Sequence, residues 1–403
     1  MSSEIETTVT GRGAAARVGV IVAVAVSAVA MRLAGVELPP VAAVAVFGGA
    51  VFAAVALLMW ASEAARVDIS GSLALAILAL VAMLPEYAVD IYFAYTAGHD
   101  PAYAAYAAAN MTGANRLLIG VAWPLLVAFA IFAVRRRGAR GDRDAVTLES
   151  HRRTEIVFLA AAAFYALVIP LTGRLAWYDT LVLGGLFAAY LWRIRGNEEG
   201  EEELVGVAAT VAVQPAGRRR SLVAALFVAA GVVILAAAEP FGDALIGAGS
   251  DLGMDEFLLV QWLAPIASEA PEVIVAITFA LRGRADDGMG ALLAAKLNQW
   301  TLLIACLPIA YYLGGGQFAG LPLDARQTEE LVLTTAQTLL GVAVLADLRL
   351  TRGEAALLFG LFAAQFVLPS PHVRYVIAAA YTLLAIVLLI RQRRHVPDLI
   401  KSL

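Results

Sequence analysis

Carboxylates stand inside two long apolar stretches of this chain. Glu86 and Asp90 lie in the first stretch, and Glu269 and Glu272 lie in the second. A carboxylate near the middle of a lipid bilayer is costly, so it marks an ion or proton path by default. One such stretch in each half of the chain indicates a transporter that is built from a repeat.

Proline and spacing give these acids the chemistry of a cation site. Glu86 and Asp90 are four residues apart, so they share one face of a helix. Pro85 and Pro271 directly precede Glu86 and Glu272. Because a proline inside a helix removes a backbone hydrogen bond, it frees a carbonyl oxygen about one turn earlier. Carboxylate and carbonyl oxygens together favour hard cations such as Na+, Ca2+ or Mg2+. A buried ion pair or a water-filled kink is the alternative interpretation.

The stretch after each acid-bearing stretch is also polar. Asn110 and Asn115 lie in the first of these, and Asn298 lies in the second. Their amide oxygens could join the coordination shell of a cation. An isolated asparagine can equally form a hydrogen bond between two membrane helices, so both interpretations stay open.

The composition predicts a polytopic helical membrane protein. Of the 403 residues, 61% are hydrophobic and 15% are charged, whereas soluble domains have about 45–50% apolar and about 25% charged residues. The apolar stretches are long and do not alternate, which favours helices over a barrel. The spans contain no histidine cluster and no pairing of a nucleophile with a base, so an enzyme is not expected. We expect the lipid bilayer and inorganic cations as partners, with no cofactor and no nucleic acid; the oligomeric state is left open.

About twelve apolar stretches have the length of a membrane span. They are roughly 16–36, 41–61, 71–97, 102–135, 155–171, 176–194, 221–239, 255–282, 288–313, 327–347, 353–369 and 373–391. With this count, the arginine clusters after the fourth, sixth, eighth, tenth and twelfth spans all lie on one side. Because positive charge marks the cytoplasmic side, both termini are expected in the cytoplasm.

The predicted topology gives two hairpins of opposite orientation. The hairpin 71–135 has its turn outside, and the hairpin 255–313 has its turn inside, which is the arrangement of inverted repeats. We therefore expect a first membrane half over 1–194 and a second over 221–403. The segment 195–220 carries an acidic run and then three arginines, and is expected to be a solvated cytoplasmic linker.

This pattern resembles the calcium/cation antiporter superfamily, which includes the sodium/calcium exchangers. Each of that family's two inverted repeats has a Gly-Thr-Ser-Leu-Pro-Glu run on one helix and a Gly-Asn-x-x-Gly-Ser-Asn run on the next. Matches to the first run are Leu84-Pro85-Glu86 in one repeat, and Ser268 with Pro271-Glu272 in the other. Matches to the second run are Asn110, Gly113 and Asn115 in one repeat, and Asn298 in the other.

The resemblance implies alternating access around a cation site at the midplane. The implied cation ligands are Glu86, Asp90, Asn110, Asn115, Ser268, Glu269, Glu272 and Asn298. Two departures from the family pattern affect which ion could bind. Lys296 stands at a glycine position of the asparagine-containing run in the second repeat, and Arg116 directly follows that run in the first repeat. We expect both to compensate charge or to couple protons.

Lys296 leaves several functions open. It can pair with Glu269 or Glu272 and occupy the place of a cation, and it can lose its proton when it is desolvated. It could also form a fixed ion pair that locks the helices. We expect a secondary antiporter that exchanges Ca2+ or a related cation against Na+ or H+, in a prokaryotic plasma membrane. The alternatives are an Na+/H+ antiporter that uses Lys296, or a non-transporting membrane protein that keeps the fold.

Overall fold

The computed structural model describes residues 2–68, 84–137, 141–194, 204, 206–368, 370–394, 397, 399 and 401. Its described part is helical apart from two pairs of short strands. In the N-terminal half the helices are α1 (Ser2–Leu33), α2 (Pro40–Ala65), α4 (Leu84–Ala97), α5 (Tyr103–Leu117), η1 (Leu118–Ala122), α6 (Trp123–Arg137), η2 (Ser150–Arg152), α7 (Arg153–Ala166), α8 (Ile169–Thr172) and α9 (Trp177–Ile194). In the C-terminal half they are α10 (Gly206–Ala212), α11 (Ala216–Leu252), α12 (Glu256–Leu281), α13 (Ala285–Asn298), η3 (Gln299–Leu303), α14 (Ile304–Leu313), α15 (Ala325–Leu345), α16 (Arg352–Val367) and α17 (Pro371–Arg391).

The chain folds into two compact units. Unit 1 comprises Met1–Tyr92 and Leu191–Pro271, and unit 2 comprises Phe93–Tyr190 and Glu272–Leu403. Each unit therefore combines a piece of the first sequence half with a piece of the second. The boundary runs through α4 and through α12, the two helices that carry the predicted carboxylates.

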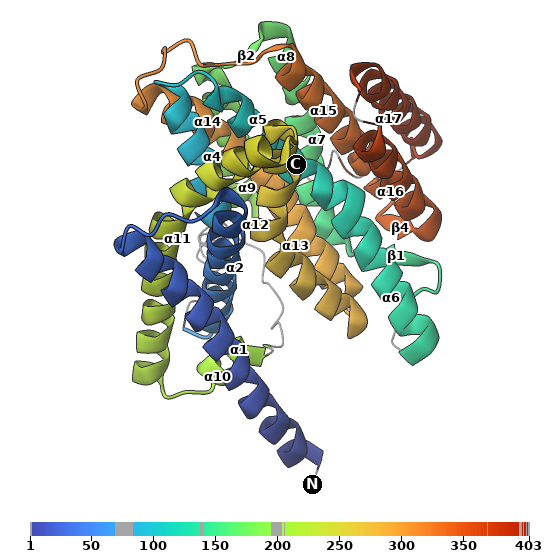
Figure 1. Cartoon of the computed structure of the whole chain (residues 1–403). Coiled ribbons are helices and arrows are strands. Elements are labelled where there is room, and N and C mark those ends of the chain that lie inside the picture. The colour runs from blue at the N-terminus through green and yellow to red at the C-terminus, as the bar shows by residue number, and fades with distance from the viewer. Residues whose placement is uncertain are drawn as a thin grey trace. The chain divides into compact units, whose positions relative to one another are not determined.

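In unit 1, α11 packs along α2, and α1 and α10 pack against the same pair (Figure 1). Gly48 of α2 allows a close approach, because a Cβ at that position would lie 2.8 Å from the Phe241 ring of α11. Without a hydrophobic driving force inside lipid, membrane helices associate through such small-residue contacts.

The seventh predicted span, 221–239, is too short. Helix α11 runs from Ala216 to Leu252 with Pro240 inside it, and it ends at Gly253, whose backbone is left-handed (φ 62°). Because α11 continues through the proline, Asp243 lies on a helix rather than in the loop between the predicted spans 221–239 and 255–282, and Glu239 lies within the helix rather than at its end.

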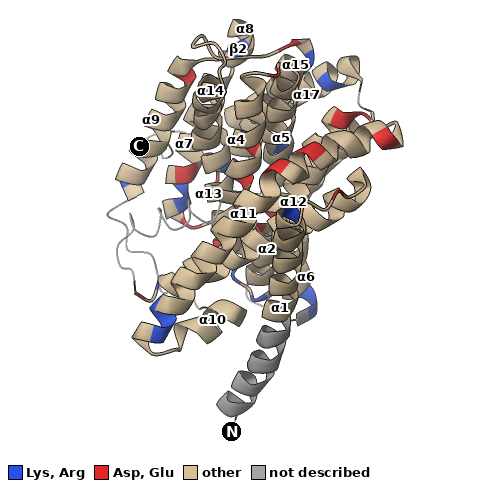
Figure 2. Cartoon of the chain, turned by 60° about the vertical axis from the view of Figure 1, so that its left-hand side comes forward, with Lys and Arg blue, Asp and Glu red and all other residues tan. Residues whose placement is uncertain are grey.

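The predicted solvated linker also differs from the structure. Residues 195–203 and 205 lie outside the described residues, but the part that follows forms α10. The Val207 and Val211 side chains of this helix are buried against Ala64, with Trp60 packed beside them. Basic residues gather at the start of α11, next to α10 (Figure 2).

Arg219 fixes this connection. Its guanidinium donates to the carbonyl oxygens of Ala212 and Gln214 at 3.2 and 3.1 Å, and to both carboxylate oxygens of Asp68 at 2.7 Å. The hydrogen bonds from Arg219 hold the pKa of Asp68 at about 2. A carboxyl group whose pKa is lowered in the folded state stabilises the fold at pH values above its unfolded pKa. This stabilisation is lost only as the pH falls through about 2, so the ion pair persists at neutral pH.

In unit 2, two antiparallel strand pairs join loops that are far apart in the sequence. Strand β1 (Ala145–Thr147) pairs with β4 (Arg349–Thr351), and β2 (Arg174–Leu175) pairs with β3 (Leu321–Pro322). The predicted topology places β1 and β4 on the cytoplasmic side and β2 and β3 on the other side. Both pairings agree with that placement.

Ion pairs in unit 1 follow the same division. Arg32 contacts Glu239 at 2.6 Å, and both are expected outside. Asp68 contacts Arg219 at 2.7 Å, and both are expected inside.

Six described helices are by themselves long and apolar enough to cross a membrane, or seven if the two parts of α12 on either side of residue 271 count as one span. Residues 71–83 of the third predicted span lie outside the described residues. Among the described helices, α16 is too short for this test, and α15 carries Glu329 and Glu330. The helical membrane class is thus confirmed at this coarser level, and the count of twelve stays a prediction.

Single cysteines test the predicted sides. Cys306 is the chain's one cysteine, so a Cys306→Ser background accepts Thr147→Cys in β1 or Gln317→Cys before β3, both exposed positions. An impermeant thiol reagent should label Gln317→Cys in intact cells and Thr147→Cys only after permeabilisation. Labelling of both positions in intact cells would contradict the topology.

Candidate functional site

The acids of α4 are buried. Glu86 is 5% exposed and Asp90 is fully buried, and their spacing places them on one face of the helix. Two residues after Asp90, the Tyr92 hydroxyl donates to an oxygen of Asp243 on α11 at 2.5 Å. This bond ties the acid-bearing part of α4 to α11 within unit 1.

The predicted ligands on α12 fall on both sides of the unit boundary. Ser268 and Glu269 belong to unit 1 and are buried, and Glu272 is the first residue of unit 2 on this helix. The Ser268 hydroxyl donates back to the carbonyl oxygens of Ala264 and Pro265, each at 3.3 Å, so its lone pairs remain available to a cation. The meeting of these acids with Glu86 and Asp90 stays a prediction.

The amides on α5 and α13 are deeply buried in unit 2. Asn110 is 1% exposed, Asn115 is fully buried and Asn298 is 3% exposed. Within the described residues, the Asn110 Oδ1 accepts no hydrogen bond. Since an unsatisfied buried acceptor costs free energy, this oxygen suits a ligand such as a cation.

Lys296 and Asn115 meet directly. The ammonium of Lys296 donates to the Asn115 Oδ1 at 2.6 Å, and its Nζ lies 3.4 Å from the Asn115 carbonyl oxygen. It also lies 4.4 Å from the centre of the Trp300 ring, which attracts a cation through its π face. Both Lys296 and Asn115 are fully buried. The structure therefore joins a lysine and an amide that the sequence placed in opposite repeats.

The Asn115 side chain is held in place for this contact. Its Nδ2 donates to the Met111 carbonyl oxygen at 2.8 Å, one turn earlier on α5. With the amide nitrogen used in this way, the Oδ1 is left to face Lys296.

Each of the two amide-bearing helices changes to a π-helix just after its polar residues. Residues Leu118–Ala122 form η1 after α5, and residues Gln299–Leu303 form η3 after α13. π-Helical segments are rare and occur frequently at functional sites. Their equivalent places in the two hairpins agree with a repeat, although no sequence pattern predicted them.

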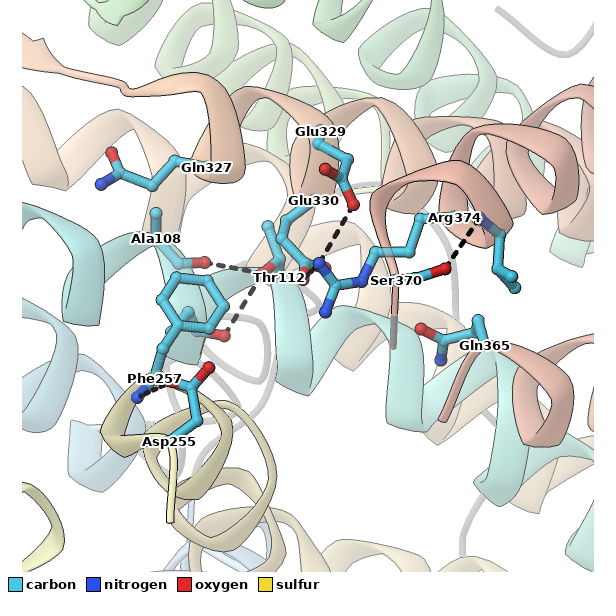
Figure 3. Close-up of polar contacts among 12 residues, drawn as sticks. Ala108, Thr112, Asp255, Phe257, Gln327, Glu329, Glu330, Gln365, Ser370 and Arg374 are labelled. Carbon is cyan, nitrogen blue, oxygen red and sulfur yellow. Dashed lines mark hydrogen bonds and ion pairs between the residues drawn. The ribbon is translucent and has the colours of Figure 1, made fainter. Parts of the chain in front are cut away.

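Arg116 is engaged by other helices. Its guanidinium contacts the Glu330 carboxylate of α15 at 2.6 Å and donates to the Gln365 Oε1 of α16 at 2.8 Å. Arg374 of α17 contacts Glu330 at 3.3 Å and Glu329 at 3.0 Å. Figure 3 shows the Arg374 side chain extending toward Glu329 and Glu330. We call Arg116, Glu329, Glu330 and Arg374 the charge network.

Sequence reasoning missed most of this network. Arg374 stands at the start of the predicted span 373–391 but was not expected to be buried, whereas the structure places it on α17 with 4% exposure. The available signal was the pair of adjacent glutamates at the start of the apolar stretch 327–347, since buried acids require partners.

One cluster outside the predicted spans has the residue types of a metal site. Ligand atoms of Glu149, His151 and Asp286 lie within 4.8 Å of one another. The Asp286 carboxylate already accepts from the Glu149 backbone N–H at 2.9 Å and from Arg152 at 3.2 Å. The arginine neutralises the carboxylate that a metal would need, so this cluster is not a candidate cation site.

Known proteins match this chain over most of its length. The family model described as "Sodium/calcium exchanger protein" matches residues 38–195 and 222–370. The chain belongs to the sodium/calcium exchanger family. It is therefore an integral membrane protein of a cation exchanger family rather than an enzyme, and such exchangers transport ions without a cofactor.

A crystal structure of the H+/Ca2+ exchanger CAX has a TM-score of 0.91 and 39% sequence identity, and the match covers 97% of each chain. The putative antiporter CaxA of Alkalimonas amylolytica is 32% identical over 152 residues, which cover 36% of this chain and 44% of that protein. The curated relative is thus matched over less than half of its length.

More distant structures share the fold alone. The structure of native YfkE has a TM-score of 0.61 at 17% identity, and the match covers 90% of this chain and 99% of that one. A structure of the sodium-calcium exchanger NCX_Mj has a TM-score of 0.53 at 17% identity, with coverage of 83% and 99%.

Replacing Asn115 tests the buried ammonium contact. Asn115→Leu keeps the branched shape of the side chain but removes the amide oxygen that accepts from Lys296, and should cost about 1.5–3 kcal/mol, since the lost bond involves a charged group. Thermal unfolding in detergent at constant pH measures the change.

Thr301→Val is the matched control. The Thr301 hydroxyl is buried and donates to the Leu297 carbonyl oxygen of its own helix at 2.6 Å. Its loss should cost about 1 kcal/mol or less. Equal costs for the two variants would show that Lys296 does not depend on the Asn115 amide.

Proposed function

We propose that this chain is an antiporter that exchanges Ca2+, or a related cation, against protons. The observation that carries the proposal is the ammonium of Lys296 on the Asn115 Oδ1, because that amide is a predicted cation ligand. A protonated lysine thus holds a place that a transported cation also requires. The exchanger family and the likeness to the H+/Ca2+ exchanger CAX support the same assignment.

The coupling follows from electrostatics. The proposed cation ligands are the carboxylates of Glu86, Asp90, Glu269 and Glu272, with amide oxygens of Asn110, Asn115 and Asn298 and the Ser268 hydroxyl. A cation bound there repels the nearby ammonium strongly, because the low dielectric of a protein interior screens charges poorly. Lys296 then loses its proton, and reprotonation on the other side favours release of the cation.

Alternating access requires the site to open to each side in turn. We propose two inverted repeats with hairpins at 71–135 and 255–313, about twelve spans and cytoplasmic termini. The loop pairings in each unit and the matching π-helices support this arrangement. The acid-bearing helices α4 and α12 each contribute residues to both units.

The cell membrane and the counter-ion follow from the same proposal. We place the protein in a prokaryotic plasma membrane, which suits its bacterial relative. Na+ is the alternative counter-ion. An Na+/H+ antiporter is the second candidate function. Lys296 favours it, because the single proton that this residue carries exchanges most simply for one monovalent cation.

Transport in reconstituted vesicles tests the proposal. Under an imposed proton gradient the wild-type protein should move Ca2+, and Glu272→Gln should lower this flux at least about tenfold, equivalent to ~1.4 kcal/mol of binding. Glu239→Gln is the control, since this half-exposed acid pairs with Arg32 at the protein surface. A surface pair contributes about 0–1 kcal/mol, so its flux should stay near that of the wild type.

Lys296→Met separates the two candidate roles of the lysine. If Lys296 couples protons, this variant should bind the cation but no longer respond to a pH gradient. If the Lys296→Met variant still transports with normal proton coupling, Lys296 has only a structural role. If the wild type moves neither Ca2+ nor Na+ under any gradient, the protein is a non-transporting member of the fold.

A further inference from the structure

Glu330 is the central acid of the charge network. It is fully buried, and its two carboxylate oxygens contact different arginines, Oε2 with Arg116 at 2.6 Å and Oε1 with Arg374 at 3.3 Å. Glu329 provides a second partner for Arg374 at 3.0 Å. Two arginines and two glutamates make the network neutral, and Glu330 is the described acid in contact with Arg116.

The network adjoins the proposed cation site through one peptide bond. The Asn115 carbonyl oxygen lies 3.4 Å from the Lys296 Nζ, and this carbonyl belongs to the peptide group that links Asn115 to Arg116. The Arg116 guanidinium is 1% exposed, so water screens its charge poorly. An uncompensated Arg116 would therefore repel both the Lys296 ammonium and an incoming cation.

We propose that Glu330 is a positioning and specificity-determining residue for transport, because it neutralises Arg116 beside the cation site. The inference rests on the proposed antiport function and adds a residue that binds no transported ion. Glu330 has two tasks in this view. Its charge keeps the electrostatic potential at Asn115 favourable for cations, and its contacts with α5 and α17 hold the amide-bearing helix in place.

Gln337 and Gln365 complete the surroundings of Arg116. The Gln365 Oε1 accepts from Arg116, and the Gln337 Nε2 lies 3.5 Å from the Arg116 carbonyl oxygen. These amides are neutral, so they can orient Arg116 but cannot cancel its charge. Glu330 is thus the residue whose replacement changes the charge with the smallest change in shape.

Glu330→Gln should weaken the apparent cation affinity about tenfold or more, because it removes the carboxylate that contacts the buried Arg116. The pH dependence of transport should also change, since the replacement alters the net charge beside the proposed cation site by one unit. Initial rates in vesicles, measured over a range of Ca2+ concentrations and pH values, report both changes.

Glu329→Gln is the matched control. It removes the same charge from a neighbouring buried position but leaves the pair between Arg116 and Glu330 intact. Its affinity should stay within about threefold of the wild type, and its pH profile should not move, because Arg116 remains neutralised.

The double variant Arg116→Met/Glu330→Gln separates charge from structure. It removes both charges, and Arg374 still has Glu329, so affinity and pH profile should return toward the wild type. If Glu330 acted only by holding helices together, the double variant would be at least as impaired as Glu330→Gln, and that result would overturn the inference.

Two further results would be equally decisive. Wild-type affinity and pH dependence in Glu330→Gln would overturn this inference while leaving the antiport function intact, whereas absence of wild-type transport would overturn the antiport function itself. If Glu330→Gln does not fold, the cation affinity of the single variant Arg116→Met tests the inference instead. The charge argument requires unchanged or tighter cation binding in Arg116→Met, and weaker binding would refute it.

Discussion

An ammonium group buried at membrane depth needs close oxygen atoms and a π face, and the structure around Lys296 supplies both. Asn115 provides an amide oxygen at 2.6 Å, and Trp300 provides its ring at 4.4 Å. Because Asn115 lies on α5 and Lys296 on α13, this one contact joins the second helices of both predicted hairpins. The positions of the other amides of unit 2 depend on the same pair of helices.

Charges inside unit 2 are neutralised in short-range groups. Arg116 and Arg374 are matched by Glu330 and Glu329, and all four are nearly inaccessible to solvent. A buried ion pair is weak evidence for stability, since desolvation offsets much of the attraction. Its value here lies in specificity, because it fixes which faces of α5, α15 and α17 meet.

The sequence was sufficient for what depends on local pattern. Glu86, Asp90 and Glu269 were recognised as buried because charges interrupt long apolar stretches, and the family followed from the motifs around them. The arginine distribution predicted a side of the membrane for each loop, and the contact of Arg219 with Asp68 agrees with that assignment. Each of these predictions needed only neighbouring residues or a count of spans.

What the sequence could not provide depends on contacts between distant segments. The pair formed by Arg116 and Glu330 joins helices that no spacing rule connects, and the packing of α10 depends on Ala64 and Trp60 of α2. The predicted span 221–239 ended just before Pro240, although a membrane helix tolerates a proline when its freed carbonyl finds a partner, and α11 continues to Leu252. The contact of Lys296 with Asn115 likewise required the pairing of α5 with α13.

The interleaved units have a consequence for biogenesis. Arg116 enters the membrane with the first half of the chain, long before the ribosome has made Glu330. An arginine at the centre of a helix costs about 2.5–3.5 kcal/mol during insertion. The contact of Arg116 with Glu330 can offset part of this cost only after α15 has been synthesised, so unit 2 reaches its final packing late in translation.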